Sequence, residues 1–379
     1  MSALSGVIVA DFSRVLAGPL AAMTLGDLGA NVIKVEPPGG DETRSWLPPV
    51  DSQGRSTYFQ TANRNKRSVT LDLKDEGDRQ LAFELAMRAD ILIENFRPGT
   101  MARFGLDWET VHAAHPALIY CSITGFGEGA GAGMPGYDPL IQALSGMMSI
   151  TGPPDGEASK VGVALVDVIA GLNAVTGILA ALHDRHTLHE GQRVEVNLIS
   201  TALAALANQS SAWLNTGVSP GRMGNVHPSI EPFSTFATAT GPIMICAGND
   251  RQFKQLAVTI GAPDLTEDLR FITNLDRVEN REALRAELEE RLRLDSVEYW
   301  SEALNDAGVP AGPVNDIGGG FGMAEALGLD PVTETDGVRT TSSPIGLSAS
   351  PVEVRLAPPG LNEHGEDIRN WLKSPREGN

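Results

Sequence analysis

The sequence predicts an α/β fold with two domains, a large one built on an open parallel sheet and a smaller α+β one. Short apolar runs alternate with helical stretches over the first 124 residues, which is typical of parallel strands. An almost wholly apolar stretch of helical length follows at residues 161–182. After a glycine- and proline-rich crossing, a strand pair and several amphipathic helices begin. A chain of 379 residues has room for two such cores.

The first third of the chain carries the pattern of the parallel sheet. Residues 6–36 predict a βαβ unit, with the strand GVIVAD, a helix from Leu20 to Leu28 and the strand NVIKVE. The alternation continues in SVTLDL (68–73), a helix from Arg79 to Ala89, DILIENF (90–96) and PALIYCSIT (116–124). Such a Rossmann-like sheet binds ligands beyond the carboxyl ends of its strands. The first turn, DFSRVLAGP, lacks the G-x-G-x-x-G pattern, so it does not favour a dinucleotide.

The later part of the chain predicts the remaining domain organisation. A half-buried strand at 192–198 and an apolar helix from Ser200 to Trp213 complete the first part of the large domain, residues 1–215. The crossing at 214–230 leads into a small α+β domain, residues 225–315. Its elements are the strands STFAT and GPIMICAG and helices at 252–260, 281–293 and 297–307. We expect the segment 316–379 to return to the large domain, because it ends in a short amphipathic helix that needs a surface to cover.

Charge and cysteine usage restrict the partners and the compartment. The formal net charge of −19 makes nucleic acid or an anionic membrane an improbable partner. An anionic ligand must therefore meet a local basic patch, and twelve of the 29 Lys and Arg residues lie within the first 103 positions. These are Arg14, Lys34, Arg44, Arg55, Arg64, Lys66, Arg67, Lys74, Arg79, Arg88, Arg97 and Arg103. Cys121 and Cys246 lie in apolar runs and predict buried, reduced thiols. With no visible secretory signal, we expect a cytoplasmic protein.

The stretch from Val161 to Leu182 carries one isolated carboxylate, that of Asp167, with Asn173 further along. Because Leu172, Val175, Leu179 and Leu182 recur at helical spacing, a buried helix is a better interpretation than a membrane span. A lone carboxylate in apolar surroundings needs compensation. It can cap the helix, or it can act as a nucleophile toward an activated acyl group, and both interpretations stay open. Neither a metal site, a serine-hydrolase elbow nor a reactive cysteine is indicated.

The glycine-rich run from Gly125 to Gly136, GFGEGAGAGMPG, predicts an irregular loop. It is either a plain surface connection or a mobile flap over an active site.

Six long segments together resemble the class III coenzyme A transferases, the family that includes formyl-CoA transferase and carnitine CoA transferase. They are residues 9–44, 63–74, 89–99, 119–127, 136–152 and 162–182. The resemblance implies a Rossmann-like large domain, a small domain and two ring-shaped chains interlocked as a homodimer. It implies transfer of CoA from an acyl-CoA donor to a free carboxylic acid, with no tightly bound cofactor. In this family the aspartate at the position of Asp167 attacks the thioester and forms anhydride and aspartyl-CoA intermediates.

The resemblance also implies which residues contact CoA. They are Val15, Ala17, Leu71, Asn95, Phe96, Arg103 and Tyr137. Two positions depart from the family pattern, since Pro37 and Met134 stand where basic residues are often found. Arg14, Arg44, Lys66 or Arg67 is expected to compensate for them.

The stretch 224–253 resembles family members that act on dicarboxylates, such as succinyl-CoA transferases. It makes Asn225, His227 and Asn249 candidate acceptor contacts, although His227 is also suited to brace the proline-rich crossing. The nearest alternative is a 2-methylacyl-CoA racemase on the same fold. Racemases of that group carry a His before an Asp where this chain has Tyr137 and Asp138, so one of two opposed acid/base groups is missing. A non-enzymatic CoA-binding protein is a third reading.

Overall fold

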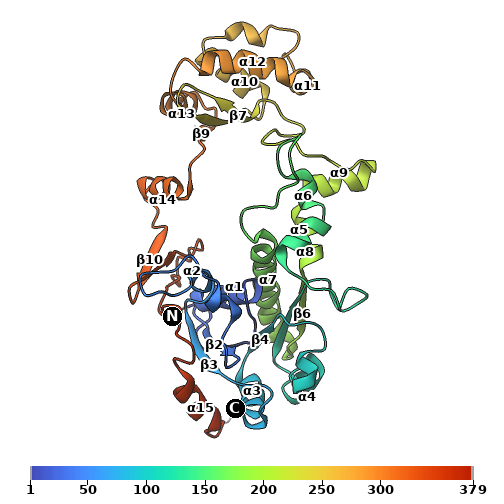
Figure 1. The fold of residues 1–379 in the computed structure, drawn as a ribbon, viewed down its shortest axis with the longest axis vertical. Coiled ribbons are helices and arrows are strands. Elements are labelled where there is room, and N and C mark those ends of the chain that lie inside the picture. The colour runs from blue at the N-terminus through green and yellow to red at the C-terminus, as the bar shows by residue number, and fades with distance from the viewer. Residues whose placement is uncertain (1, 377–379) are drawn as a thin grey trace. The chain divides into compact units, whose positions relative to one another are not determined.

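The computed structural model describes residues 2–376, and it divides the chain into two compact units (Figure 1). The first unit contains residues 1–147, 160–219 and 330–379, and the second contains 148–159 and 220–329. The crossing therefore falls at 219/220, between the expected boundaries at 215 and 225. Unlike the expected small domain, 225–315, the second unit also takes residues 148–159 and continues to Leu329. The C-terminal return accordingly begins at Asp330 rather than at residue 316.

The first unit is built on a six-stranded parallel sheet, as predicted, in the order β3-β2-β1-β4-β5-β6. Its strands are β1 (Ile8–Asp11), β2 (Asn31–Glu36), β3 (Lys66–Thr70), β4 (Ile91–Glu94), β5 (Ile119–Thr124) and β6 (Arg193–Asn197). From β1 the chain continues through β2 to β3 at one edge of the sheet. It then returns to the other side of β1 with β4 and continues through β5 to β6 at the opposite edge. The carboxyl ends of β1 and β4 therefore form the switch point where open α/β sheets bind ligands.

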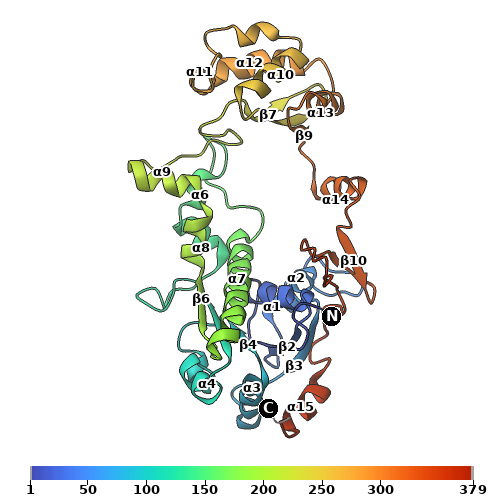
Figure 2. The ribbon, with the colours of Figure 1, turned by 180° about the vertical axis from the view of Figure 1, so that it is seen from behind.

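Helices cover both faces of this sheet. On one face α1 (Ala17–Asp27) and α7 (Leu165–Leu188) pack side by side (Figures 1 and 2). The contact depends on Gly171, because a Cβ there would lie 2.7 Å from the Ala17 carbonyl oxygen. On the other face lie α3 (Glu76–Arg88), α4 (Trp108–Ala114) and α15 (Gly365–Lys373). Ile368 and Leu372 of α15 are buried there, so the amphipathic tail helix covers this sheet.

The apolar helix α7 is buried on one face only. It is the one helix within residues 2–376 that is long and apolar enough to cross a membrane. Val175 and Leu182 are buried as predicted, but Leu172 and Leu179 are 49% and 36% exposed, so that part of the expectation is wrong. The inward face instead uses small residues, such as Ala170 and Ala174, which allow the close approach of α1.

Two other local expectations differ from the structure. The predicted helix from Ser200 to Trp213 is two helices, α8 (Leu198–Ala205) and α9 (Asn208–Thr216), because Ala207 adopts φ 46° and ψ −110° between them. Cys121 is buried as expected, whereas Cys246 is only half-buried. Burial raises the pKa of the Cys246 thiol.

The remaining elements of the first unit are η1 (Glu42–Ser45), α2 (Thr57–Thr61), η2 (Met101–Phe104), α5 (Asp138–Leu144), α6 (Met147–Ile150), β10 (Val332–Thr335) and β11 (Val338–Thr341), of which α6 continues into the second unit.

The second unit has its own core on a three-stranded antiparallel sheet. Its strands are β7 (Phe233–Ala237), β8 (Pro242–Cys246) and β9 (Ala311–Pro313). Its helices are α10 (Asp250–Thr259), η3 (Pro263–Thr266), α11 (Asn274–Glu279), α12 (Arg281–Leu292), α13 (Val297–Asp306) and α14 (Ile317–Ala326). Buried leucines at every fourth position of α12, namely Leu284, Leu288 and Leu292, pack one face of that helix into the core.

Candidate active site

A pocket of the first unit lies at the switch point of its sheet. Its walls come from the β1–α1 turn, the turn after β4, the glycine-rich loop and the start of α7. It brings together the predicted nucleophile, Asp167, and five of the seven predicted CoA contacts, namely Val15, Ala17, Asn95, Phe96 and Tyr137. The position agrees with the rule that ligands bind beyond the carboxyl ends of parallel strands.

Asp167 is the third residue of α7 and does not cap the helix. The N-cap position is occupied by Ala164, which has no side-chain hydrogen bond. The helix is capped instead by Asp138, whose Oδ2 accepts hydrogen bonds from the backbone N–H of Val166 at 2.8 Å and of Asp167 at 3.2 Å. The capping interpretation of Asp167 is therefore wrong, because α5 supplies the acceptor.

The Asp167 carboxylate is left free in a partly buried position. Within residues 2–376 its side chain accepts no hydrogen bond and forms no ion pair. Burial, and then the negative charge of Asp138, raises the pKa of Asp167 to about 7. A carboxylate of raised basicity that faces a pocket without a protein partner is available for chemistry.

The turn between β1 and α1 is held in an unusual conformation at the pocket wall. Val15 has φ 68°, which an L residue with a branched side chain rarely adopts. Its backbone N–H is directed to the Asp41 carboxylate, at 3.3 Å from Oδ2. Asn95 accepts a hydrogen bond from the backbone N–H of Arg14 at 2.9 Å and donates one to the Arg14 carbonyl at 2.7 Å. Two separate side chains thus fix the turn that lines the site.

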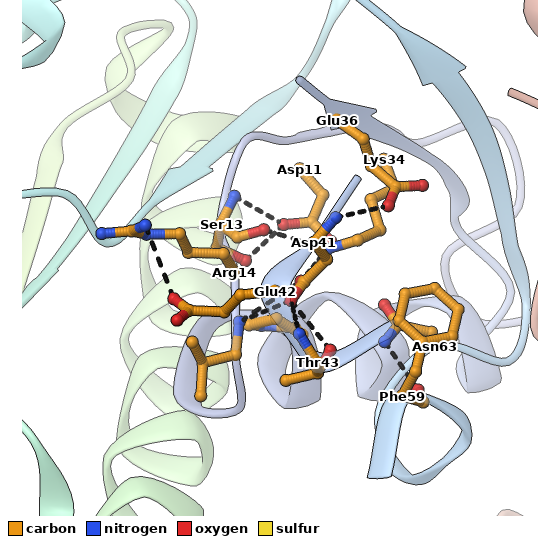
Figure 3. A network of polar contacts seen from close by, with 12 residues as sticks. Asp11, Ser13, Arg14, Lys34, Glu36, Asp41, Glu42, Thr43, Phe59 and Asn63 are labelled. Carbon is orange, nitrogen blue, oxygen red and sulfur yellow. Dashed lines mark hydrogen bonds and ion pairs between the residues drawn. The ribbon is translucent and has the colours of Figure 1, made fainter. Parts of the chain in front are cut away.

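Buried ion pairs lie next to this turn, and Figure 3 shows the residues around the pair of Lys34 and Asp41. The Lys34 ammonium donates to Asp41 at 2.9 Å and to the Ser13 carbonyl at 3.0 Å. The Lys66 ammonium donates to Asp11 at 2.8 Å, and burial lowers its pKa to about 8 despite that partner. Burial would raise the pKa of Asp41, but Lys34 and the hydrogen bonds from Thr43 outweigh it and hold the pKa below its usual value. Neither ammonium group lines the pocket.

The basic residues near the N-terminus consequently do not form the expected patch. Arg44 makes a bidentate ion pair with Glu36, with both nitrogen–oxygen distances 2.7 Å, and Arg64 pairs with Asp27. Lys66 is fully buried, and neither Arg44 nor Lys66 lines the pocket. Arg67 is not among the residues that line the pocket.

Two arginines do line the pocket, Arg14 and Arg97. Arg14 lies 3.5 Å from Glu42 and stacks over the Phe96 ring at 5.6 Å. The exposed Arg97 side chain has no hydrogen-bond or ion-pair partner among residues 2–376. Arg97 is one of the twelve basic residues near the N-terminus, but it was not predicted as a site residue. Its position directly after Asn95 and Phe96, at the carboxyl end of a parallel strand, was the signal that could have done so.

Two candidate CoA contacts of the first unit, Leu71 and Arg103, do not line this pocket. Leu71 is 1% exposed in the core, and Arg103 lies exposed in η2. The three candidate acceptor contacts belong to the second unit and make local contacts there. Asn225 donates to Thr235, His227 packs edge-on against Phe233, and Asn249 caps α10 through the backbone N–H of Gln252. Across residues 2–376, no group of three or more His, Cys, Asp and Glu side chains is placed to hold a metal ion.

The glycine-rich loop forms one wall of the pocket through Gly131, Ala132, Met134, Pro135 and Gly136. Its two ends meet, because a Cβ on Gly125 would lie 2.5 Å from the Gly136 Cα. No side chain fits between these two backbone segments. The glycines at its two ends therefore close the base of the loop.

A carboxylate without a protein partner at the switch point of a parallel sheet, beside two arginines, is suited to nucleophilic chemistry on an anionic substrate in an α/β enzyme. Comparison with known proteins specifies the class: the sequence pattern of "CoA-transferase family III" matches residues 4–365. The chain belongs to this family and is a CoA-transferase.

Relatives and solved structures agree with that membership over almost the whole chain. The acetyl-CoA:oxalate CoA-transferase of Acetobacter aceti is 40% identical, with 98% of this chain and 96% of the relative covered. The succinate–glutarate CoA-transferase of Agrobacterium fabrum is 41% identical, with the same coverage. The crystal structure of a CAIB/BAIF family protein from Brucella suis has a TM-score of 0.89 and 42% identity, and the match covers 98% of this chain and 100% of that one.

Proposed function

We propose that the protein moves CoA from an acyl-CoA donor to a dicarboxylic acid, with Asp167 as the nucleophile. One observation carries the proposal: the partly buried Asp167 carboxylate faces the switch-point pocket with no hydrogen-bond partner among the described residues. A nucleophile committed to a cap or an ion pair would have to break that contact first. The apolar surroundings of α7 also suit an anhydride, which survives only where water is excluded.

The reaction proceeds through two exchanges at the same carboxylate. An Asp167 oxygen attacks the thioester carbonyl, the C–S bond breaks, and CoA thiolate leaves a mixed anhydride. The thiolate attacks the Asp167 carbonyl, which releases the donor acid and leaves an aspartyl-CoA thioester. The acceptor carboxylate then attacks this thioester, giving a second anhydride and free thiolate. Attack of the thiolate on the acceptor carbonyl forms the new acyl-CoA and regenerates Asp167.

The pocket supplies groups suited to the CoA chain. Val15 and Ala17 offer the backbone of the fixed turn, Phe96 and Tyr137 offer ring faces, and Asn95 orients the turn. We assign the phosphate contacts to Arg14 and Arg97, since the Lys34 and Lys66 ammonium groups are fully buried. We infer that the glycine-rich loop closes over the bound thioester.

The dicarboxylate acceptor rests on the relatives, whose names specify oxalate and glutarate. Succinyl-CoA or acetyl-CoA is the corresponding donor. Asn225, His227 and Asn249 stay predicted contacts of the acceptor acid. The two free cysteines fit a reducing cytoplasm.

We also propose that two copies of the chain associate through the outer face of the first unit. Apolar side chains are exposed along consecutive helices there, including Leu172 and Leu179 of α7, Leu203 of α8 and Trp213 and Leu214 of α9. Large apolar side chains left exposed on several helices are typical of a protein–protein interface. The family resemblance implies that the association is an interlocked homodimer.

Trapping of the covalent intermediate tests the reaction. We expect incubation with succinyl-CoA followed by hydroxylamine to modify Asp167, as mapped by mass spectrometry. Asp167→Ala should abolish both the label and CoA transfer to glutarate. Asp184→Ala, on the exposed C-terminal end of the same helix, is the matched control and should retain both.

Two results would contradict this assignment. One is wild-type transfer by Asp167→Ala. The other is deuterium wash-in at the α-carbon of a 2-methylacyl-CoA without any acceptor acid, which is the behaviour of a racemase.

A further inference from the structure

We propose that Asp138 is a positioning residue with two effects. It fixes the start of α7, and its charge disfavours the ionised form of the Asp167 carboxyl group. The proposal rests on the proposed function, because it assigns Asp138 a role in the nucleophilic attack by Asp167. Asp138 itself does not contact the substrate in this scheme.

The first observation is the geometry of the Asp138 carboxylate. Asp138 is the first residue of α5 and is 3% exposed. Its Oδ2 accepts from the backbone N–H groups of Val166 and Asp167, at 2.8 and 3.2 Å. Because Ala164 supplies no side-chain acceptor, these N–H groups would otherwise lack a partner inside the protein. The carboxylate thus takes over the N-cap function from a different helix.

The second observation is a fully buried glutamine that locks Asp138 in place. The Gln142 Nε2 donates to Asp138 Oδ1 at 2.5 Å, and its Oε1 accepts from the backbone N–H of Val161 at 2.9 Å. Gln142 has no exposed surface. One side-chain pair therefore ties α5 both to the first turn of α7 and to the segment that leads into it.

The donors around Asp138 use both of its carboxylate oxygens. Two of these donors are N–H groups at the positive end of the α7 dipole, and the third is the Gln142 amide. Asp138 therefore lies beside the nucleophile with both oxygens hydrogen-bonded to the protein.

The charge environment of Asp167 makes Asp138 the dominant neighbour. The groups that face it are Asp138 of α5, Tyr58 of α2, and Arg14, Glu42 and Tyr137 around the pocket. The positive charge of Arg14 is already paired with the carboxylate of Glu42. After burial, the Asp138 charge is the cause that raises the pKa of Asp167 to about 7. A more basic carboxylate is the stronger nucleophile once ionised, but a smaller fraction is ionised below neutral pH.

The pH profile of kcat/KM tests this role, since it reports ionisations of the free enzyme. For the wild type we expect an acid limb near pH 7. Asp138→Asn keeps the shape and one acceptor oxygen but removes the charge, and it should move the acid limb down by about one pH unit. Its kcat above pH 8 should fall, because Asp167 becomes less basic. Thermal unfolding of the variant establishes that it is folded.

Gln142→Leu is the matched control. This variant removes the hydrogen bonds of Gln142 to Asp138 and Val161 but keeps the Asp138 carboxylate. It should therefore lower thermal stability and activity, while the acid limb of the pH profile stays at the wild-type pH. An Asp138→Asn profile with an unmoved acid limb, in a variant that still labels at Asp167, would overturn this inference and leave the proposed function standing. Absence of the Asp167 label in the wild type would overturn both.

Discussion

The side chain of Asn95 and the backbone of Arg14 exchange two hydrogen bonds, so the turn after β4 holds the turn after β1. These turns follow the two strands at which the sheet order reverses. Asn95 therefore contributes to the site through the backbone it fixes. The same turn is held from its other side by Asp41, which faces the N–H of Val15.

Asn95→Ala removes both hydrogen bonds to Arg14. We expect the KM for the acyl-CoA to rise about tenfold, which corresponds to about 1.4 kcal/mol, while kcat changes less. The physical reason is that the free turn must be ordered when CoA binds. Steady-state kinetics with varied acyl-CoA measures the effect. Asn95→Asp keeps the acceptor for the Arg14 N–H and loses the donor, so its KM should fall between the two; equal KM values for all three proteins would contradict the role.

Gly125→Ala should disrupt the base of the glycine-rich loop. The new Cβ would meet the Gly136 Cα at 2.5 Å, and overpacking against backbone costs about 1–3 kcal/mol. We expect lower transferase activity and faster proteolysis within residues 125–136. Gly129→Ala is the control in the same loop, because a Cβ at Gly129 meets nothing within 4 Å. Loss of activity to the same extent in both variants would show that loop flexibility, and not the contact at its base, is what matters.

The buried pair of Lys66 and Asp11 should be far more important for stability than an exposed pair. Both side chains are fully buried, and removal of one partner leaves an unpaired buried charge. We expect Lys66→Ala to lower the free energy of unfolding by about 3–5 kcal/mol, measured by urea denaturation. Arg55→Ala breaks the pair with Asp51, in which Arg55 is 39% exposed, and should cost about 0–1 kcal/mol. Similar losses in the two variants would mean that the buried pair is not specifically stabilising.

Several strands could be predicted from the sequence because they are short apolar runs between turn signals, whereas β3, KRSVT, begins two residues before the predicted 68–73. β4 lies inside the predicted 90–96, and β2 matches its predicted strand. The break between α8 and α9 could not be predicted, since Ala207 carries no sequence signal for its positive φ. Local propensity favours a continuous helix there, and the tertiary structure overrides it.

In the candidate site, too, some features could be predicted from the sequence and others could not. Asp167 stood out because a lone carboxylate in an apolar stretch needs an explanation. Its partner could not be predicted, because Asp138 lies 29 residues away and the contact exists only after folding. The number of basic residues near the N-terminus was also a poor guide. It does not reveal which of them are neutralised internally, as Lys34 is by Asp41.

Asp167 should make the folded protein less stable as the pH rises. Its pKa is raised to about 7 in the folded state, against about 4 in an unfolded chain, so the folded state binds more protons between these pH values. The associated stability is present below about pH 4 and is lost as the pH rises through 7. Asp167→Asn should therefore be more stable than the wild type at pH 8, and this difference should shrink as the pH falls toward 4. Urea denaturation at both pH values checks it, and a pH-independent difference would argue against the raised pKa.

The exposed leucines of α7 should hold two copies of the chain together. We expect light scattering to give a mass twice the 40.1 kDa of one chain. Leu172→Arg combined with Leu179→Arg places two charges in the proposed interface, and it should lower the dimer fraction on dilution, because burial of an unpaired charge is costly. Leu269→Arg is the control: this leucine is 82% exposed, outside the helices of the second unit, and its replacement should leave the mass unchanged. A wild-type mass of one chain, or an undisturbed dimer in the double variant, would place the association elsewhere or exclude it.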